Sequence, residues 1–280
     1  MARDRPRAGG GPAAEEAASV NGVRQGTLTP GALSGLAWTL VRTDFKTRYQ
    51  PTVGGFVWAL LKPFAMFLVL IAVFSFIFGG DPAYRFYLII GLFLWDFFAE
   101  ATKHGLVSLQ AKSYLLNKAP FPSWILVVTA ASNALITLAV FCVVITVFLA
   151  AAGRAPGVGA LALFLLYLVQ YTLIVLGFSL AASVLFLRYR DLNQVWDVAI
   201  QAGFFVAPIV YPLSIIPERF HFFLYLWPPT PIIQFSRAVL VDGTVPTARA
   251  HAFLALETLV VFGAGVLLFR ALAPRVAEYL

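Results

Sequence analysis

Six long apolar stretches follow residue 54 of this chain, and they restrict its possible folds more than any other feature. A helix needs roughly 20 apolar residues to cross a bilayer. We place the spans at about residues 56–78, 86–101, 124–152, 161–187, 195–210 and 253–272. A membrane β-barrel is disfavoured, because the stretches are long and do not alternate between apolar and polar residues. Only 12% of the residues are charged, against about a quarter in soluble domains. We therefore expect an all-α membrane protein with six transmembrane helices.

The chain begins with a polar segment that lacks the features of a signal peptide. Residues 1–33 are rich in Gly, Ala, Pro and Arg and contain no apolar core, so we expect a disordered cytoplasmic tail. Apolar side chains then recur at every fourth position from Leu33 to Tyr49. This spacing predicts an amphipathic interface helix over residues 34–50, lying along the membrane surface among lipid headgroups. The alternative is a charged lead-in to the first span.

The distribution of Lys and Arg predicts the orientation of the chain. If the N-terminus is cytoplasmic, most Lys and Arg residues outside the spans lie in segments on the cytoplasmic side. Cytoplasmic loops of membrane proteins carry this excess. We therefore expect both termini in the cytoplasm. The same distribution accounts for the net charge of +7, so we expect membrane lipids around the chain and no nucleic-acid partner.

The inner loop over residues 102–123 is too long for a simple turn. Its apolar residues from Leu106 to Leu115 lie at roughly helical spacing, between Gly105 and Pro120. The loop carries lysines and no acidic residue. One interpretation is a short, rigid cytoplasmic helix that receives force from a partner protein. The other is a solvated basic loop, and the pattern favours neither.

The outer segment over residues 211–250 combines prolines with apolar pieces. Residues 220–227 and 232–241 are apolar, and each piece is too short to cross a bilayer. Short apolar helices at membrane depth must pack on protein or line a cavity. We therefore expect a re-entrant helical pair that caps an outer vestibule. Our candidate residues for this outer gate are Phe220, Phe223, Trp227, Ile232, Phe235 and Arg237.

Charged and polar residues in or near the spans suggest contacts between helices rather than a catalytic role. Asp96 and Glu100 lie one helical turn apart near the end of the second span. A pairing of Arg188 or Arg190 with such acidic residues would tie the inner helix ends together, although solvation at the interface is an equal alternative. Cys142 is the only cysteine, so no disulfide framework is expected.

The sequence contains no motif that holds a nucleotide. A Walker A loop ends in Gly-Lys-Ser/Thr, and the dipeptide Gly-Lys does not occur in this chain. We therefore expect that the chain binds no cofactor itself and that ATP and Mg are used by a partner ATPase. A membrane enzyme acting on polyprenyl lipids is disfavoured, because none of the histidines has acidic neighbours suited to metal binding or proton transfer. We expect no catalytic residue and no metal ligand.

A series of short motifs connects these features with a known family. The series includes Arg48-Tyr49, Gly54-Gly55, Trp58, Pro63, Leu115–Pro122, Arg188–Asp191, Ala207–Pro212, Leu226–Pro231 and Phe235–Arg237. In order and spacing, residues 34–280 resemble the permease subunit of type-2 ABC exporters, which move lipid-linked polysaccharides and polyol phosphates. One departure concerns the outer gate: the family usually has Asn-Pro where this chain has Trp227-Pro228.

The resemblance implies a function and a set of partners. It implies a homodimer of permeases around a channel in the bacterial cytoplasmic membrane, two ABC ATPase subunits beneath it, and a lipid-linked glycan as substrate. O-antigen, teichoic acid, capsule and cell-wall galactan all fit. The alternatives are a type-2 ABC permease for small molecules or drugs, and an ATP-independent lipid-glycan flippase. Our candidates for coupling to the ATPase are Arg42, Lys46, Arg48, Leu109, Lys112, Tyr114 and Lys118.

Aromatic residues are the candidates for the channel wall. Sugars present flat C–H faces, which aromatic rings bind weakly enough for a polymer to slide. Aromatic residues of spans also face lipid or the interface, so a lipid-facing position is the alternative for each. Our candidates are Phe56, Trp58, Phe204, Phe205 and Tyr211, with Trp196 at the inner mouth.

Overall fold

A long central helix organises the chain. The computed structural model describes residues 30–49, 54–78, 80–116 and 122–275, and all regular structure within them is helical. The helices are α2 (Pro30–Tyr49), α3 (Phe56–Phe78), α4 (Tyr84–Ala111), α5 (Ser113–Leu116), α6 (Trp124–Ala130), α7 (Ser132–Ala151), α8 (Val158–Arg188), α9 (Leu192–Val206), α10 (His221–Tyr225), α11 (Pro229–Arg237) and α12 (Ala248–Leu272). Short 3-10 turns cover Leu213–Ile215, Glu218–Phe220 and Ala273–Arg275, and a π-helical turn covers Ala238–Asp242.

Four helical segments are long and apolar enough to cross a membrane. They are α3, the continuous pair α6–α7, α8 and α12. Two other helices coincide with expected spans but differ in character: α4 is 28 residues long and carries charged residues, and α9 has only 15 residues. The all-helical prediction is confirmed in the described residues, whereas six crossings stay a prediction.

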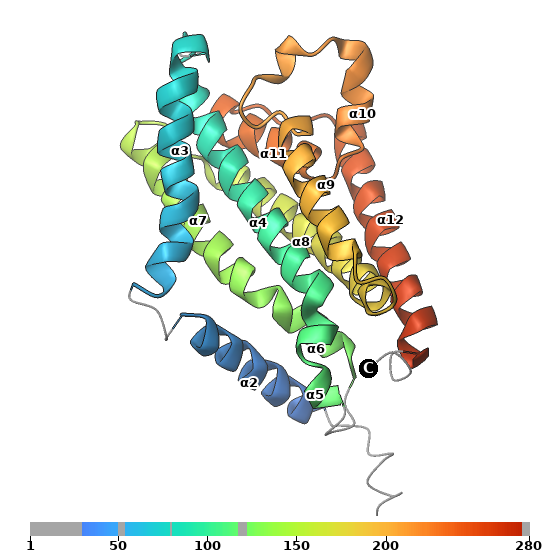
Figure 1. The fold of residues 1–280 in the computed structure, drawn as a ribbon. Coiled ribbons are helices and arrows are strands. Elements are labelled where there is room, and N and C mark those ends of the chain that lie inside the picture. Colours follow the sequence, from blue (N-terminus) through green and yellow to red (C-terminus); the bar gives the residue numbers. More distant parts are fainter. Residues whose placement is uncertain (1–29, 50–53, 79, 117–121, 276–280) are drawn as a thin grey trace, which may run out of the picture.

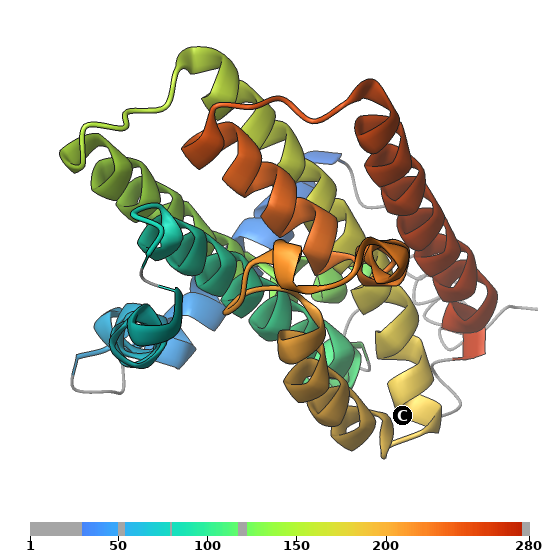
Figure 2. The ribbon, with the colours of Figure 1, turned by 90° about the horizontal axis from the view of Figure 1, so that it is seen from above.

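Helix α4 forms the core of the molecule. It packs against α3, α7, α8, α9 and α11 (Figures 1 and 2). Most of its residues from Tyr84 to Leu109 are buried, as expected for a helix that is surrounded by other helices. On its far side, α8 packs closely against α12. A Cβ on Gly177 of α8 would lie 2.5 Å from the Cα of Phe262 of α12, and such small residues let membrane helices approach closely.

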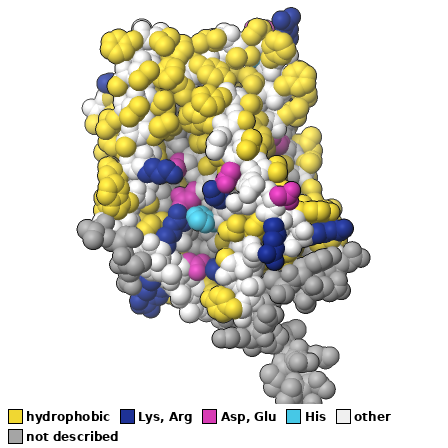
Figure 3. Space-filling view, viewed as in Figure 1, with side chains coloured by type: hydrophobic (Ala, Val, Ile, Leu, Met, Phe, Trp, Pro, Cys, Tyr) yellow, Lys and Arg dark blue, Asp and Glu magenta, His cyan; other side chains and the backbone are white. Residues whose placement is uncertain are grey.

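The two ends of the bundle differ in kind. Helix α2 lies across one end, beside α5, and α10 projects at the opposite end (Figure 1). We call these the α2 end and the α10 end. In the space-filling view, apolar side chains cover the part of the molecule toward the α10 end, and charged side chains gather toward the α2 end (Figure 3). The charged side chains therefore gather at the end of the molecule where α2, the expected interface helix, lies.

Several helix boundaries differ from the expected ones for local reasons. The interface helix begins at Pro30 rather than residue 34, and proline is favourable at the first helical position. The second span was expected to end at residue 101, with a separate short helix from Leu106 as one interpretation of the loop. That start is wrong, because α4 continues unbroken to Ala111. Helix α9 ends at Val206 rather than 210, since Pro208 removes a helical donor and restrains the residue before it. Residues 1–29 of the expected tail lie outside the described residues.

Candidate functional site

A groove of about 700 Å³ runs between α3, α4 and α9. We call it the α3–α9 groove. Its wall is mostly apolar and includes the rings of Trp95, Phe204 and Phe205. The rings of Trp95 and Phe204 meet edge to face, with centroids 5.9 Å apart. The groove is therefore a long apolar surface with aromatic faces along one side.

Three polar side chains also line this groove. They are Lys62 of α3, Asp96 of α4 and Gln201 of α9. Lys62 is exposed, and no carboxylate lies within ion-pair distance of it in the described part of the chain. Charged residues at membrane depth are costly and generally face protein or a path for a polar ligand. The groove thus offers an apolar wall, the ammonium group of Lys62 and the carboxyl group of Asp96.

The helices beside the groove are poorly covered on their outer faces. In α9 only Gly203 is buried, and Val195, Val198 and Phe205 are exposed. Helix α3 has only Pro63, Phe67 and Leu70 buried. Both helices lie on one side of the molecule, away from α12 (Figure 2). This side is an apolar surface without a partner among the described residues, which in a membrane is covered by lipid or by another protein.

An aromatic cluster holds α9 against the core from behind. The ring of Trp227, from the segment between α10 and α11, lies 5.8 Å from that of Phe98, 6.4 Å from that of Trp95 and 6.3 Å from that of Trp196. We call these four residues the tryptophan cluster. A Cβ on Gly203 would lie 2.5 Å from the Trp227 ring, so only glycine permits this approach. The cluster joins the α10 end to α4 and α9.

Three further contacts hold the other end of α9. Trp196 Nε1 donates a hydrogen bond of 3.0 Å to Thr102 Oγ1, and the Trp196 ring stacks on Phe178 with centroids 4.0 Å apart. Nearby, Lys103 Nζ lies 2.7 Å from Asp197 Oδ1. The end of α9 nearest α2 is therefore tied to α4 by one ion pair and one hydrogen bond.

Two ion pairs tie α2 to α4, and we call them the α2 clamp. Arg48 pairs with Glu100, and Lys112 pairs with Asp44. Glu100 lies within α4, and Lys112 directly follows its last residue, so the two pairs contact α4 more than two helical turns apart. His104 Nε2 lies 3.9 Å from Glu100 Oε1. The α2 clamp therefore joins α2 to α4 and to the residue that follows it.

At the α10 end, one arginine joins three segments. Arg237 of α11 is buried; its Nε donates to Tyr87 O at 2.9 Å, Nη1 to Pro208 O at 2.6 Å and Nη2 to Ile209 O at 2.9 Å. Burial lowers the pKa of this guanidinium to about 10, so it remains charged at neutral pH. A Cβ on Gly91 would lie 2.6 Å from Nη2, so glycine leaves the space that the guanidinium occupies.

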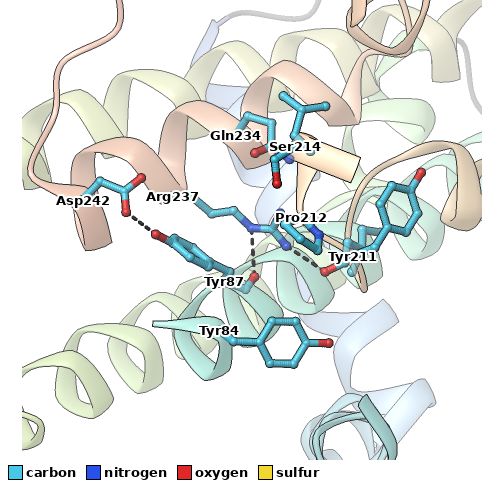
Figure 4. A pocket seen from close by; sticks show the side chains of 10 residues that line it. Tyr84, Tyr87, Tyr211, Pro212, Ser214, Gln234, Arg237 and Asp242 are labelled. Carbon is cyan, nitrogen blue, oxygen red and sulfur yellow. Dashed lines mark hydrogen bonds between the residues drawn. The ribbon is translucent and has the colours of Figure 1, made fainter. Parts of the chain in front are cut away.

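The predicted lining residues lie in different places. Phe204 and Phe205 line the α3–α9 groove. Phe56 packs instead on α2, with its ring 5.2 Å from that of Tyr49, and Trp58 of α3 is 61% exposed. Trp196 belongs to the tryptophan cluster. Tyr211 lines a separate pocket beside Arg237 (Figure 4). The structure therefore brings two of the predicted aromatics together and separates the others.

The predicted coupling residues are partly paired and partly free to contact a partner. Arg48 and Lys112 form the α2 clamp. Arg42, Lys46 and Tyr114 are exposed. Leu109 is completely buried, so it can anchor the segment but not touch another protein. Lys118 lies outside the described residues.

The predicted outer-gate residues divide into a surface group and a core group. Phe220 and Phe223 are exposed, in the turn before α10 and in α10 itself. Ile232, Phe235 and Arg237 are buried in α11, which packs against α4 and α8. Trp227 lies between the two groups in the sequence and enters the tryptophan cluster. The two halves of the expected pair are thus unequal: α11 belongs to the core and α10 to the surface.

The inner ion pairs differ from the expected ones. Glu100 pairs with Arg48 rather than with Arg188 or Arg190, because α2, which packs on α6 and α7, brings Arg48 to α4. Asp44 was missed as a partner of Lys112, although it is the only acidic residue of the predicted interface helix. Within the described residues, no group of three or more His, Cys, Asp and Glu side chains could hold a metal ion.

The chain is similar to proteins of one functional kind. The family described as ABC-2 type transporter matches residues 35–241. An O-antigen export system permease protein RfbA of Klebsiella pneumoniae is 27% identical over 254 residues, which cover 89% of this chain and 96% of the relative. A protein of the same name from Myxococcus xanthus is 27% identical over 252 residues, covering 87% and 95%. A polysialic acid transport protein KpsM of Escherichia coli is 22% identical over 233 residues, covering 81% and 89%.

Proposed function

Because the chain belongs to the ABC-2 type transporter family, we propose that it is the permease subunit of an ATP-driven exporter of a lipid-linked polysaccharide. The observation that carries this proposal is the nearly full-length similarity to permeases named for O-antigen export and polysialic acid transport. ATP and Mg are used by two separate ABC ATPase subunits. O-antigen, teichoic acid and cell-wall galactan are all glycans of the proposed class.

The transport path lies between two copies of the chain. Each copy crosses the bacterial cytoplasmic membrane six times, with α4 and α9 as the second and fifth crossings. The α2 end lies at the cytoplasmic side, where the charged side chains gather (Figure 3). The exposed apolar faces of α3 and α9 turn toward the second copy, so that the two α3–α9 grooves together enclose the path.

The groove has the chemistry that a sliding glycan requires. The faces of Phe204, Phe205 and Trp95 contact the C–H faces of sugar rings without fixed hydrogen bonds. Weak and repeated contacts avoid a bound state that would stall the polymer. Lys62 supplies a positive charge for the phosphate that joins the glycan to its lipid.

Force from the ATPase enters at the α2 end. The exposed residues Arg42, Lys46 and Tyr114 contact the ATPase. The α2 clamp then moves α4 together with α2. The Lys103–Asp197 pair and the Trp196–Thr102 hydrogen bond pass this motion to α9, which forms a wall of the groove. The path widens as α9 shifts relative to α3.

Depletion of the chain in living cells tests the proposed substrate. The expected result is a finished, lipid-linked glycan that accumulates on the cytoplasmic leaflet, measured by extraction and by protection from an external glycosidase. Depletion that leaves every envelope glycan at its normal amount and location contradicts the proposal. Accumulation of a small molecule instead would indicate a permease of another substrate class.

Purification in mild detergent tests the proposed partner. The tagged chain is expected to recover an ABC ATPase in equal amount, and vesicles with both proteins should export glycan only when ATP is present. Glycan transport by the chain alone, in vesicles without ATP, would establish an ATP-independent flippase and overturn the proposal.

A further inference from the structure

A second pocket lies at the α10 end and shares no residue with the α3–α9 groove. It has a volume of about 330 Å³ and lies between the start of α4, the irregular segment after α9, and α11 (Figure 4). We call it the α11 pocket. Its volume is at the lower end of the range of about 300–1,000 Å³ for small-molecule sites. The transport path and the proposed ATPase contacts leave this pocket without a role.

The donors that line the α11 pocket are largely used by the protein itself. The three nitrogens of the Arg237 guanidinium each donate to a backbone carbonyl. The hydroxyl of Tyr84 donates to Val210 O at 2.7 Å, and that of Tyr211 donates to Phe205 O at 2.8 Å. The Tyr87 hydroxyl donates to the Asp242 carboxylate. Two of the five Arg237 N–H groups, one amide N–H of Gln234 and the hydroxyl of Ser214 have no acceptor among the described residues, so these four donors remain for a ligand.

The acceptors of the α11 pocket are mostly free. Each tyrosine oxygen that donates a proton still has lone pairs to accept one. The Gln234 amide donates through Nε2 to Pro208 O at 3.5 Å, so its oxygen stays available. Asp242 is exposed and accepts from Tyr87 through one of its two carboxylate oxygens. A fitting ligand therefore donates hydrogen bonds, as hydroxyl groups do.

The same inventory disfavours a phosphate ligand. A phosphate group only accepts hydrogen bonds at neutral pH and requires donors or free cations around it. Here the Arg237 guanidinium gives three of its five N–H groups to carbonyl oxygens, and the nearby Asp242 carboxylate offsets its charge and would repel an anion. The rings of Tyr84, Tyr87 and Tyr211 add flat apolar faces. Aromatic faces together with free acceptors suit a neutral, polyhydroxylated ring.

We infer that the α11 pocket is a saccharide subsite on the exit side, which holds a sugar residue of the exported glycan as it leaves the path. The inference rests on the proposed function, since it takes the exported polymer as the ligand. A weak hold at this place retains the emerging chain while the partner ATPase resets. The subsite thus opposes backward sliding without blocking forward movement.

The test uses the whole transporter, this chain with its ATPase, and a defined probe. The probe is the glycan that mild acid releases from the lipid-linked pool of depleted cells, which carries neither lipid nor phosphate. Saturation-transfer NMR reports its binding. The signal is expected with the wild type and is expected to fall at least about fivefold in Gln234→Leu and Tyr211→Leu, because each removes a contact worth about 1 kcal/mol.

Matched variants separate sugar binding from folding. Tyr211→Phe loses the hydroxyl, and with it the bond to Phe205 O and one acceptor, but keeps the ring, so its signal should lie between those of the wild type and Tyr211→Leu. Glu218→Gln removes an exposed carboxylate outside the pocket and should bind as the wild type does. All variants must copurify with the ATPase in the same amount. Equal signals from the wild type and both leucine variants overturn the subsite.

Further outcomes distinguish the subsite from the proposed function. Inorganic pyrophosphate at the concentration of the glycan should not compete, and competition would overturn the subsite in favour of an anion site. A wild type that exports the glycan in vesicles but gives no signal overturns the subsite alone. Cells that accumulate no lipid-linked glycan on depletion overturn the proposed function, and the subsite with it.

Discussion

Arg237 holds together a part of the α10 end that has no regular structure. Residues 207–210 follow the end of α9, and the carbonyls of Pro208 and Ile209 lack helical partners. The Arg237 guanidinium donates to both and also to Tyr87 O in α4. Buried carbonyls without a donor are costly, so one side chain stabilises three segments at once.

Replacement of Arg237 measures this stabilisation. Arg237→Met should destabilise the purified chain by about 2–4 kcal/mol, because each buried group left without a partner costs about 1–3 kcal/mol. The stability of Arg237→Lys should lie between those of the wild type and Arg237→Met, since an ammonium group cannot reach all three carbonyls. The midpoint of thermal unfolding in detergent is the measurement. The control is Arg219→Met, at an exposed arginine of the same end; an equal midpoint for both Met variants contradicts the role of Arg237.

Gly91 depends on Arg237, and a double-mutant cycle shows this dependence. Gly91→Ala places a methyl group 2.6 Å from Nη2, so it should cost about 1–3 kcal/mol in the wild type. In the Arg237→Met background most of that cost should disappear, because the flexible Met side chain can move away. Simple additivity of the two unfolding free energies would show that the residues are not coupled.

At the scale of elements, α4 connects the two helices, α2 and α9, that we propose to move during transport. Its second half contacts α2 through the α2 clamp and α9 through Thr102 and Lys103. Partly exposed ion pairs contribute little to folding, about 0–1 kcal/mol each. Their effect on the alignment of two helices is larger than their effect on stability. The clamp is therefore best tested by transport rather than by unfolding.

Charge reversal within the α2 clamp should uncouple glycan export from ATP hydrolysis. Asp44→Lys places two lysines side by side and should lower export at least about fivefold, the factor for roughly 1 kcal/mol, while ATP hydrolysis continues. Asp44→Lys combined with Lys112→Asp should restore export. Both rates are measured in vesicles that contain the ATPase. Failure of the double reversal to restore export, with normal assembly, would indicate that Asp44 acts other than through Lys112.

The contact between Trp227 and Gly203 should couple the α10 end to α9. Gly203→Ala sets a methyl group against the indole ring and should lower export while the chain still assembles with its ATPase. Trp227→Phe provides room for that methyl group, so it should recover much of the lost export in the double variant. Export that is unaffected by Gly203→Ala would show that α9 moves independently of Trp227.

At the scale of the whole molecule, the two sides of the bundle are both apolar but lie beside different features. The exposed faces of α3 and α9 flank the groove, whereas the exposed face of α12 lies on the other side (Figure 2). In the proposed dimer the first side meets the second copy and the α12 side meets lipid. Composition cannot distinguish the two, since both faces carry large aliphatic residues.

Cysteine cross-linking distinguishes these sides. In a Cys142→Ser background, Val198→Cys on α9 should form a disulfide-linked dimer under mild oxidation, since the Cα atoms of a disulfide lie within about 7 Å of each other. Leu259→Cys on α12, exposed to a similar degree, should not. Nonreducing electrophoresis of native membranes gives the result. A dimer from Leu259→Cys alone would place the second copy on the opposite side.

The helical content and the order of the helices could be predicted from apolar stretches alone. The span at 56–78 has the observed boundaries, because α3 is a continuous apolar stretch with few buried residues, so local hydropathy decides its limits. Prediction failed where tertiary contacts decide. Gly105 does not interrupt α4. Leu106 and Leu109, which follow it, are completely buried, and this packing stabilises the helix beyond the glycine. Of the candidate site, Phe204 and Phe205 were found by their aromatic character, but the facing Lys62 and Trp95 were not.

The apolar stretches by themselves predicted a helical membrane protein, because the length and polarity of each stretch are local properties, and the order of short motifs carried the resemblance to ABC-2 permeases. Only the tertiary structure decided which residues meet. The pairing of Lys112 with Asp44, the insertion of Trp227 beside Gly203 and the three bonds of Arg237 join residues far apart in the chain. Such contacts depend on how the helices rotate and pack, and a hydropathy pattern carries no information about that rotation.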